Sequence, residues 1–238
     1  MHGLVNETRF PQNRTRIMKA DPKQRRRGRP PKSEIPKSEL LLRAALTIFA
    51  EEGFSAASMR RIATEARTDV ALITHSFGSK ADLWKAVIDQ LADRLQKAMT
   101  AVDIDEDETL SASERLRRTM VCVVDIMADT PHIAQFLMKE ISHTGDKFDY
   151  IYERLARPFR DLLVPLMHEA RRENGLPDVD GNLAFISCCG AIATTVAARP
   201  FVERLGDQPR TDQEFRQAVA LAAYSQVLPL AVTGGNAQ

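Results

Sequence analysis

"LLRAALTIFAEEGFSAASMRRIATEARTDVALITHSFGSKADLW", residues 41–84, is the stretch that decides the fold. Its first part shows helical periodicity, because apolar residues one and two turns apart fall on a single face. These residues are Leu41, Ala44, Ala45, Ile48 and Phe49. Ser38 is a candidate N-cap and Gly53 a candidate C-terminal stop. The pattern predicts a helix between these two residues, with the apolar face in the core.

Two short helices and one long helix are predicted in the rest of this stretch. Ser58 can cap "MRRIATEA" and Asp69 can cap "VALITHSF", because both side chains accept hydrogen bonds from helix N–H groups. Ser79 and Asp82 form a capping-box-like opening to a helix that begins at Lys80. Two short helices joined by a tight turn are typical of a helix-turn-helix unit, which places its second helix in the DNA major groove.

The rest of the chain is also predicted to be helical. The acidic segment "DIDEDE", residues 103–108, is interpreted as a solvated loop. Helical patterns follow at about 112–129, 131–143, 148–174, 182–199 and 211–230. The aromatic content is only 6%, and we find no convincing strand pattern. The expected fold class is therefore all-α.

Charge is distributed unevenly along the 238 residues. Residues 1–90 carry 17 Lys and Arg against 10 Asp and Glu, whereas residues 91–238 carry 16 against 22. The formal net charge of the whole chain, +1, conceals this difference. A basic first third and an acidic remainder indicate that one end of the protein meets a polyanion.

Several classes of protein are disfavoured by the sequence. The three cysteines are few and no signal peptide is evident, which favours a reducing cytoplasm. The longest nearly uncharged run, residues 183–198, has 16 residues, whereas about 20 are needed to span a bilayer. The His and Cys residues lack metal-ligand spacing, and no P-loop or nucleophile elbow occurs. We therefore predict no membrane span, metal, cofactor or enzymatic activity.

The N-terminal arm, residues 1–37, lacks apolar periodicity and contains "KQRRRGRPPK" at 23–32. Within it, Arg27-Gly28-Arg29-Pro30 resembles the core of an AT-hook. The narrow minor groove of A·T-rich DNA attracts Arg side chains, and Pro keeps the chain extended. The alternative is a generic basic tail that is attracted to any phosphate backbone. Contacts from Arg27 and Arg29 to the minor groove are the favoured hypothesis.

The landmarks "AALTIFAEEGF", "MRRIATEA" and "FGSKADLW" resemble the TetR family of transcriptional regulators in order and spacing. The resemblance implies a DNA-binding domain at 38–84, a helical effector-binding and dimerisation domain at 85–232, and a flexible tail at 233–238. It also implies a homodimer through the last two long helices, near 182–199 and 211–230. The alternative for the first of these helices is burial within a monomer.

The turn and the recognition helix depart from the family pattern. Arg67 stands where Gly is common and Asp69 where Ser is common, while Thr74 replaces the usual aromatic residue. Apolar residues in this helix limit the readout of base edges to contacts such as those with thymine methyl groups. The candidate DNA-binding residues are Arg27, Arg29, Ser58, Arg67, Asp69, Val70, Ala71, Thr74, His75 and Lys80. For His75 the alternative is an ordinary surface histidine.

An effector cavity is expected among the helices at 112–174. Its candidate lining residues are Met120, Val124, Met127, His132, Phe136, Phe159 and Leu163. Core packing alone would bury the same apolar side chains. Met-rich linings adapt to varied shapes, which would suit a small apolar or aromatic effector.

These expectations together indicate a cytoplasmic, homodimeric DNA-binding transcriptional regulator, most simply a repressor released from double-stranded DNA by a small molecule. Two alternatives remain open at this point. One is an architectural protein that binds A·T-rich DNA without ligand control, and the other is an enzyme with a helical core and a basic tail.

Overall fold

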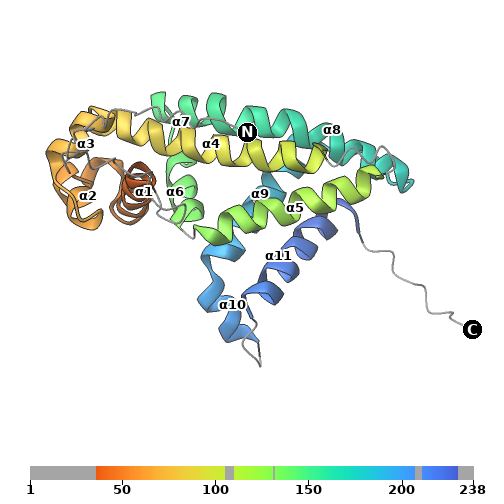
Figure 1. The fold of residues 1–238 in the computed structure, drawn as a ribbon. Helices are drawn as coiled ribbons and strands as arrows, with labels where there is room; N and C mark the ends of the chain where they lie inside the picture. Colours follow the sequence, from red (N-terminus) through yellow and green to blue (C-terminus); the bar gives the residue numbers. More distant parts are fainter. Residues whose placement is uncertain (1–35, 105–109, 131, 207–210, 230–238) are drawn as a thin grey trace, which may run out of the picture. The chain divides into compact units, whose positions relative to one another are not determined.

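The computed structural model describes residues 36–104, 110–130, 132–206 and 211–229. These ranges form α-helices and one π-helix, without any strand among them (Figure 1), so the predicted all-α class is confirmed. Several predictions fall outside the described residues: the N-terminal arm with Arg27 and Arg29, most of the acidic loop, and the tail at 233–238. Residues 103 and 104, which were predicted to lie in the acidic loop, belong to helix α4.

The first four helices match the predicted order: α1 (Lys37–Ala56), α2 (Met59–Glu65), α3 (Val70–Phe77) and α4 (Lys80–Ile104). The predicted caps are present. The Ser58 hydroxyl accepts a hydrogen bond from the backbone N–H of Arg61 at 3.2 Å, and the Asp69 carboxylate accepts one from that of Leu72 at 3.3 Å. The prediction for the start of α1 was wrong, because Pro36 rather than Ser38 precedes the helix. Pro fits this place because it has no N–H to satisfy.

A break inside α1 confirms the stop predicted at Gly53. Gly53 has φ 78° and ψ 162°, outside the helical range, and the chain makes one more short turn to Ala56. A positive φ of this size is readily adopted only by glycine. The regular part of α1 therefore ends at Gly53.

Eight further segments follow. They are α5 (Ala112–Asp129), α6 (His132–Ile141), α7 (Asp146–Ile151), the π-helix η1 (Tyr152–Ala156), α8 (Arg157–Glu173), α9 (Gly181–Ala197), α10 (Arg199–Leu205) and α11 (Asp212–Val227). The single helix predicted at 148–174 is therefore divided into three. Pro158 offers a reason, because it has no N–H to bond the carbonyl of Arg154 in the preceding turn.

Two hydrophobic clusters hold the described helices together. One contains buried residues of α5, α8, α9 and α11 with Met99 of α4, and the other contains residues of α1 to α4 together with α6 and α7. Phe136 of α6 belongs to the second cluster: its ring centroid lies 6.4 Å from that of Phe49 and 6.2 Å from that of Trp84. The helix-turn-helix segment thus shares its core with a helix that lies about 50 residues beyond it in the sequence.

Candidate functional site

Helix α3 presents a defined outer face. Ile73 is fully buried and fixes the helix to the core, while Val70 is half-buried. Ala71, Thr74 and His75, which the sequence predicted as contacts, are all exposed. Side chains of these types can meet thymine methyl groups, base edges or phosphates in a major groove.

Leu72 also belongs to this face, although it was not among the DNA contacts predicted from the sequence. It is 39% exposed although it is large and apolar. The helical periodicity contained the signal, because Leu72 directly precedes the buried Ile73 and so points about 100° away from it. With Ala71, it gives the outer face of α3 a mainly apolar character.

The turn between α2 and α3 has the geometry for which glycine is usually chosen. Arg67 has φ 50°, the only positive φ at a non-glycine position among the described residues. The N–H of Thr68 bonds the carbonyl of Ala63 at 2.9 Å, and that of Arg67 bonds the carbonyl of Thr64 at 3.1 Å. These two bonds form a Schellman motif with Arg67 at the left-handed position. The guanidinium is exposed beside α3.

We expect Arg67→Gly to raise the free energy of unfolding by about 1 kcal/mol, because it relieves a left-handed conformation that costs roughly this much. If Arg67 contacts a phosphate, the same variant binds DNA more weakly. The slope of the logarithm of its DNA affinity against the logarithm of salt concentration should then fall in magnitude by about one. Urea denaturation and DNA titration at several salt concentrations measure the two effects. Unchanged DNA binding would exclude Arg67 from the interface.

Lys80 lies in an environment that does not favour the predicted phosphate contact. Its Nζ donates to the backbone carbonyls of Phe54 at 2.8 Å, Ala57 at 2.8 Å and Ser55 at 3.4 Å. An ammonium group has three N–H donors, so all three are engaged. Lys80 therefore ties the end of α1 to the start of α4.

Lys139 of α6 also binds backbone carbonyls near the end of α1. Its Nζ donates to the carbonyl of Glu51 at 3.0 Å and also to that of Ala50. Cations at the C-terminal end of a helix are stabilised by the helix dipole. The end of α1 is thus held by two lysines, one from α4 and one from α6.

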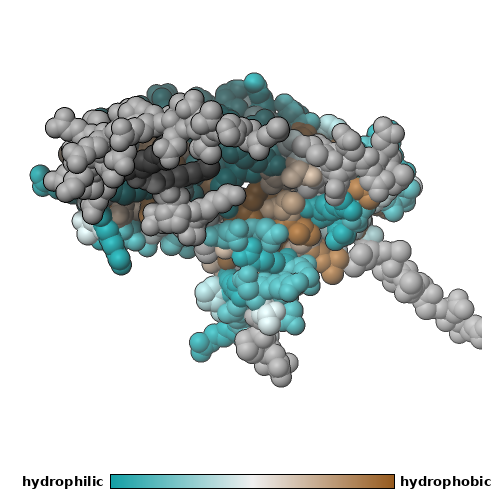
Figure 2. Space-filling view, in the orientation of Figure 1, coloured by the Kyte–Doolittle hydropathy of each residue, from teal (hydrophilic) through white to brown (hydrophobic). Residues whose placement is uncertain are grey.

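Hydrophobic side chains are exposed on α9, α10 and α11. Leu183 and Ile186 of α9 are 64% and 50% exposed, and Leu221 of α11 is 52% exposed. Phe201 and Leu205 of α10 are also exposed. Figure 2 shows hydrophobic residues at the surface around α5, α9 and α11. Large exposed apolar patches mark sites of association.

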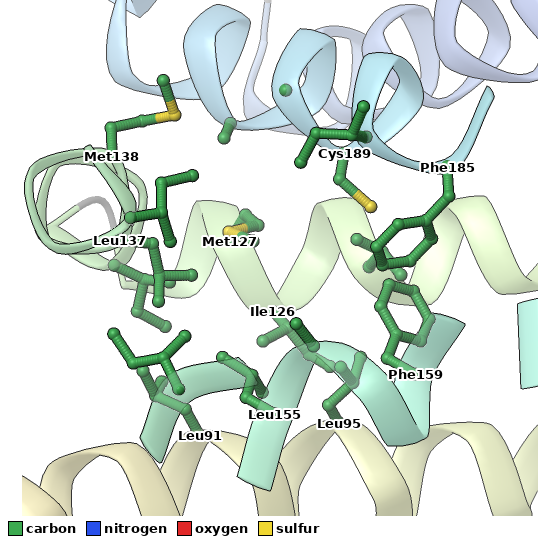
Figure 3. A pocket seen from close by; sticks show the side chains of 18 residues that line it. Leu91, Leu95, Ile126, Met127, Leu137, Met138, Leu155, Phe159, Phe185 and Cys189 are labelled. Atoms are coloured by element: carbon green, nitrogen blue, oxygen red, sulfur yellow. The ribbon is translucent and has the colours of Figure 1, made fainter. Parts of the chain in front are cut away.

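A cavity of about 350 Å³ lies among α4, α5, α6, α7, η1, α8 and α9 (Figure 3). Every side chain around it is apolar or ends in sulfur. The lining residues are Leu91, Leu95, Val123, Ile126, Met127, Ile133, Leu137, Met138, Ile141, Ile151, Leu155, Ala156, Phe159, Phe185, Ile186, Cys189, Gly190 and Ala193. The volume falls in the range of small-molecule sites.

The lining corrects most of the cavity residues expected from the sequence. Met127 and Phe159 do line the cavity. The others do not: Met120, Val124, Phe136 and Leu163 are buried in the two clusters, and His132 lies at the first residue of α6. Helix α5 is apolar on two faces, and the face at Val123, Ile126 and Met127 is the one that meets the cavity.

The sulfur groups near the cavity are uncharged. Burial raises the pKa of the Cys188 thiol to about 11 and raises that of Cys189 further. Cys189 lines the cavity, whereas Cys188 is fully buried and its thiol lies 3.4 Å from the sulfur of Met120. The cavity therefore offers a ligand no ionic partner.

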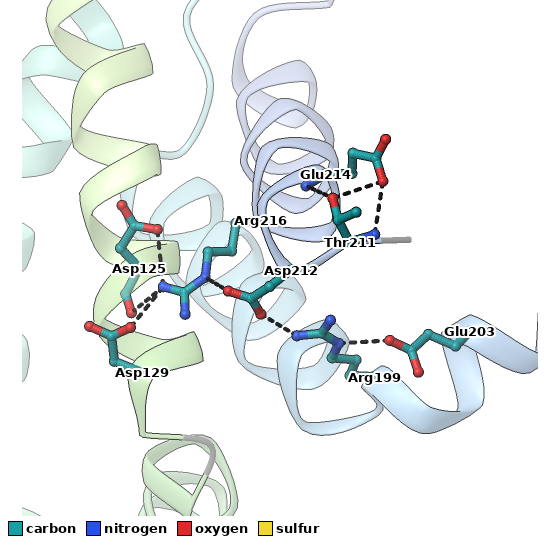
Figure 4. A network of polar contacts seen from close by, with 8 residues as sticks. All are labelled: Asp125, Asp129, Arg199, Glu203, Thr211, Asp212, Glu214 and Arg216. Atoms are coloured by element: carbon teal, nitrogen blue, oxygen red, sulfur yellow. Dashed lines mark hydrogen bonds and ion pairs between the residues drawn. The ribbon is translucent and has the colours of Figure 1, made fainter. Parts of the chain in front are cut away.

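A network of ion pairs holds α11 against α5 and α10 (Figure 4). The Arg216 guanidinium lies 2.8 Å from a carboxylate oxygen of Asp129 and 2.7 Å from one of Asp212. Arg199 pairs with Asp212 as well. The capping box between Thr211 and Glu214 starts α11 beside this network. These contacts position α11 relative to α5 and α10.

The described residues also bear on two other possibilities, a metal site and a helix that spans a membrane. Among the described residues, no group of three or more His, Cys, Asp or Glu side chains could hold a metal ion. In the same ranges no single helix is both long and apolar enough to cross a bilayer; two sharply bent helix pairs meet those criteria only when taken together.

Two segments of the chain match known families. Residues 41–87 match the model described as bacterial regulatory proteins, tetR family. Residues 112–231 match the C-terminal domain of the HTH-type transcriptional dual regulator CecR. The first match covers most of α1, α2, α3 and the start of α4, and the second covers α5 to α11.

Relatives with curated names agree with these matches. The HTH-type transcriptional dual regulator CecR of Shigella flexneri is 28% identical over 147 residues, which are 57% of this chain and 65% of that protein. The HTH-type transcriptional repressor NicS of Pseudomonas putida is 26% identical over 105 residues, which are 44% and 48%. The matches thus span less than two thirds of the length of either relative.

A solved structure shows the same fold. The fatty acid degradation regulator FadR of Bacillus halodurans aligns with a TM-score of 0.60 and 19% identity, over 84% of this chain and 99% of that one. The CecR-type match covers half of the chain. The helix-turn-helix, the fold and both family matches agree, and this chain belongs to the TetR family of bacterial regulatory proteins.

Proposed function

We propose that this protein is a DNA-binding transcriptional regulator, most simply a repressor, that binds its operator as a homodimer and is released by a small apolar effector. The exposed outer face of α3 carries the proposal, because Ile73 anchors the helix while Ala71, Leu72 and His75 face outward. A regulator of this kind acts in the cytoplasm and is not an enzyme.

The proposed DNA contacts follow from the geometry of α2 and α3. Ala71 and Leu72 approach thymine methyl groups, while Thr74 and His75 reach base edges or phosphates. Val70, half-buried, borders this face. Ser58 and Asp69 act at the N-terminal ends of the two helices, and Arg67 contacts phosphate. Lys80 is left out of the interface because its N–H groups bind carbonyls.

The homodimer is proposed to form through the exposed apolar faces of α9 and α11. Leu183, Ile186 and Leu221 supply side chains that a second copy would bury. A two-fold dimer presents two recognition helices to half-sites about one DNA turn apart. Residues Arg27 and Arg29 of the N-terminal arm are proposed to add contacts in the minor groove beside each half-site.

Helix α6 is the proposed link between the effector and the DNA. It lines the cavity with Ile133, Leu137 and Met138, while Phe136 and Lys139 contact the first helix of the DNA-binding segment. An effector that displaces α6 also displaces α1, so the recognition helices no longer match the half-sites. By linkage, effector and DNA weaken each other's binding by the same factor.

Sequencing of genomic DNA captured by the protein tests the DNA-binding proposal. The full chain is compared with a chain that begins at Ser33 and so lacks the Arg-rich segment. We expect both to enrich the same palindrome, with the shorter chain binding more weakly, and most weakly at A·T-flanked sites. Loss of all discrete sites with the arm, leaving only broad A·T-rich enrichment, would support an architectural DNA-binding protein instead.

A further inference from the structure

A second cavity shares a wall with the first. It has a volume of about 330 Å³ and lies between α4 on one side and η1 and α8 on the other. Three side chains line both cavities: Leu95 of α4, Leu155 of η1 and Phe159 of α8. In Figure 3 these three lie together at the edge of the first cavity that faces α4 and α8. These three side chains therefore lie between the two spaces.

The two cavities differ in chemistry. The first is lined by hydrocarbon and sulfur groups, whereas the second contains the polar side chains of Gln96, Thr100 and Arg154. Gln96 and Thr100 are exposed on α4, so the polar end of the second cavity lies near solvent. A path from the polar end to the apolar end therefore runs past Leu155 and Phe159.

The π-helix η1 forms part of the wall between the cavities. Leu155 touches both spaces, Ala156 only the first, and Arg154 only the second. A π-helix is rare and tends to occur at functional sites. Its wider turn places three consecutive residues along the path between the cavities.

From this arrangement we infer that the effector is one amphiphilic molecule, with an apolar body in the first cavity and an uncharged polar head between Gln96 and Thr100 in the second. The inference rests on the proposed function, because it takes the first cavity as the effector site. It goes further by naming the chemical class of the ligand, which is an alcohol, ketone or amide with a hydrocarbon body.

The charges around the second cavity indicate an uncharged head. Nε of Arg154 donates to Asp89 at 2.7 Å, and one of its terminal nitrogens donates to Asp93 at 2.7 Å. Lys97 lies with Asp93, Gln96 and Thr100 at a neighbouring surface recess. Arg154 and Lys97 are thus balanced by Asp89 and Asp93, and an anionic head would gain no net attraction. The Gln96 amide provides both a donor and an acceptor. The Thr100 hydroxyl donates to the backbone carbonyl of Gln96 at 2.9 Å, which leaves its oxygen as an acceptor.

Calorimetric titration of the full chain with three probes of one chain length tests the charge of the head. The probes are decan-1-ol, decanoate and decyltrimethylammonium, and naphthalene serves as a probe without a polar head. We expect decan-1-ol to bind at least about tenfold more tightly than either ion, because the balanced charges near the head give an ion no net attraction to offset its partial loss of hydration. Decanoate binding as tightly as decan-1-ol would overturn the inference.

Two variants locate the head and the body separately. Gln96→Leu is expected to weaken the binding of decan-1-ol about 3- to 10-fold, which corresponds to the loss of one hydrogen bond. The binding of naphthalene should be unchanged. Gln90→Leu, the same change at another position of α4, lies outside the linings of both cavities and is the matched control. Ala193→Leu narrows the first cavity and should weaken the binding of both decan-1-ol and naphthalene.

The outcomes separate the two proposals. If naphthalene binds and weakens DNA binding but Gln96→Leu does not affect decan-1-ol, the first cavity remains the effector site and the amphiphile inference is wrong. If neither naphthalene nor decan-1-ol binds to a protein that still binds its operator, the effector role of the first cavity is itself wrong.

Discussion

Phe136→Ala is expected to lower the free energy of unfolding by about 3–5 kcal/mol, as is usual for truncation of a buried phenylalanine. The ring is fully buried and packs against Phe49 and Trp84, so its removal leaves a cavity between α6 and the helix-turn-helix segment. Because one side chain serves both parts, the effector domain and the DNA-binding segment should lose stability together.

Urea denaturation followed by two signals measures this effect. The emission of Trp84, the only tryptophan, reports on the DNA-binding segment, and far-ultraviolet circular dichroism reports on all helices. Both transitions should shift to lower urea by the same amount. Tyr152→Ala, at an exposed position of η1, is the control and should change little. A Trp84 transition that stays in place would mean that the DNA-binding segment is stabilised without α6.

Leu221→Asp is expected to lower affinity for a palindromic operator by about 10²- to 10⁴-fold, the gain that linking two binding modules provides. The side chain is 52% exposed on α11, within the face proposed to join two subunits. A buried, unpaired carboxylate would oppose that association, and each monomer would then meet only one half-site.

Sedimentation equilibrium and fluorescence anisotropy with labelled operator DNA test this prediction together. Val179→Asp is the matched control, because Val179 is also an exposed apolar residue but lies in the segment between α8 and α9. The control should remain dimeric and should bind DNA as the unmodified protein does. A monomeric Leu221→Asp variant with unchanged operator affinity would contradict the dimer mechanism, and a dimeric one would place the subunit interface elsewhere.

The DNA-binding segment was the most predictable part of the fold because its signals are local. The caps at Ser58 and Asp69 and the stop at Gly53 depend only on nearby hydrogen bonds and backbone angles. The position of Lys80 could not be predicted in the same way. Its partners are carbonyls 23 to 26 residues earlier, which no sequence spacing indicates.

The cavity was the least predictable feature. Periodicity shows that α5 is apolar but does not show which of its apolar faces packs tightly and which borders an empty space. Met120 and Val124 fill the core, whereas Val123 and Met127 line the cavity. The division of 148–174 was also missed, because a helix can contain proline with only a local change of turn, as at Pro165.

The three thiols of this protein are expected to be chemically unreactive. Burial raises the pKa of Cys122 and Cys189 and brings that of Cys188 to about 11, so all three thiols are protonated at neutral pH. The thiolate is the form that reacts with peroxides and electrophiles. Although Cys189 lines the cavity, a ligand bound there should therefore remain unattached to the thiol and leave by simple dissociation.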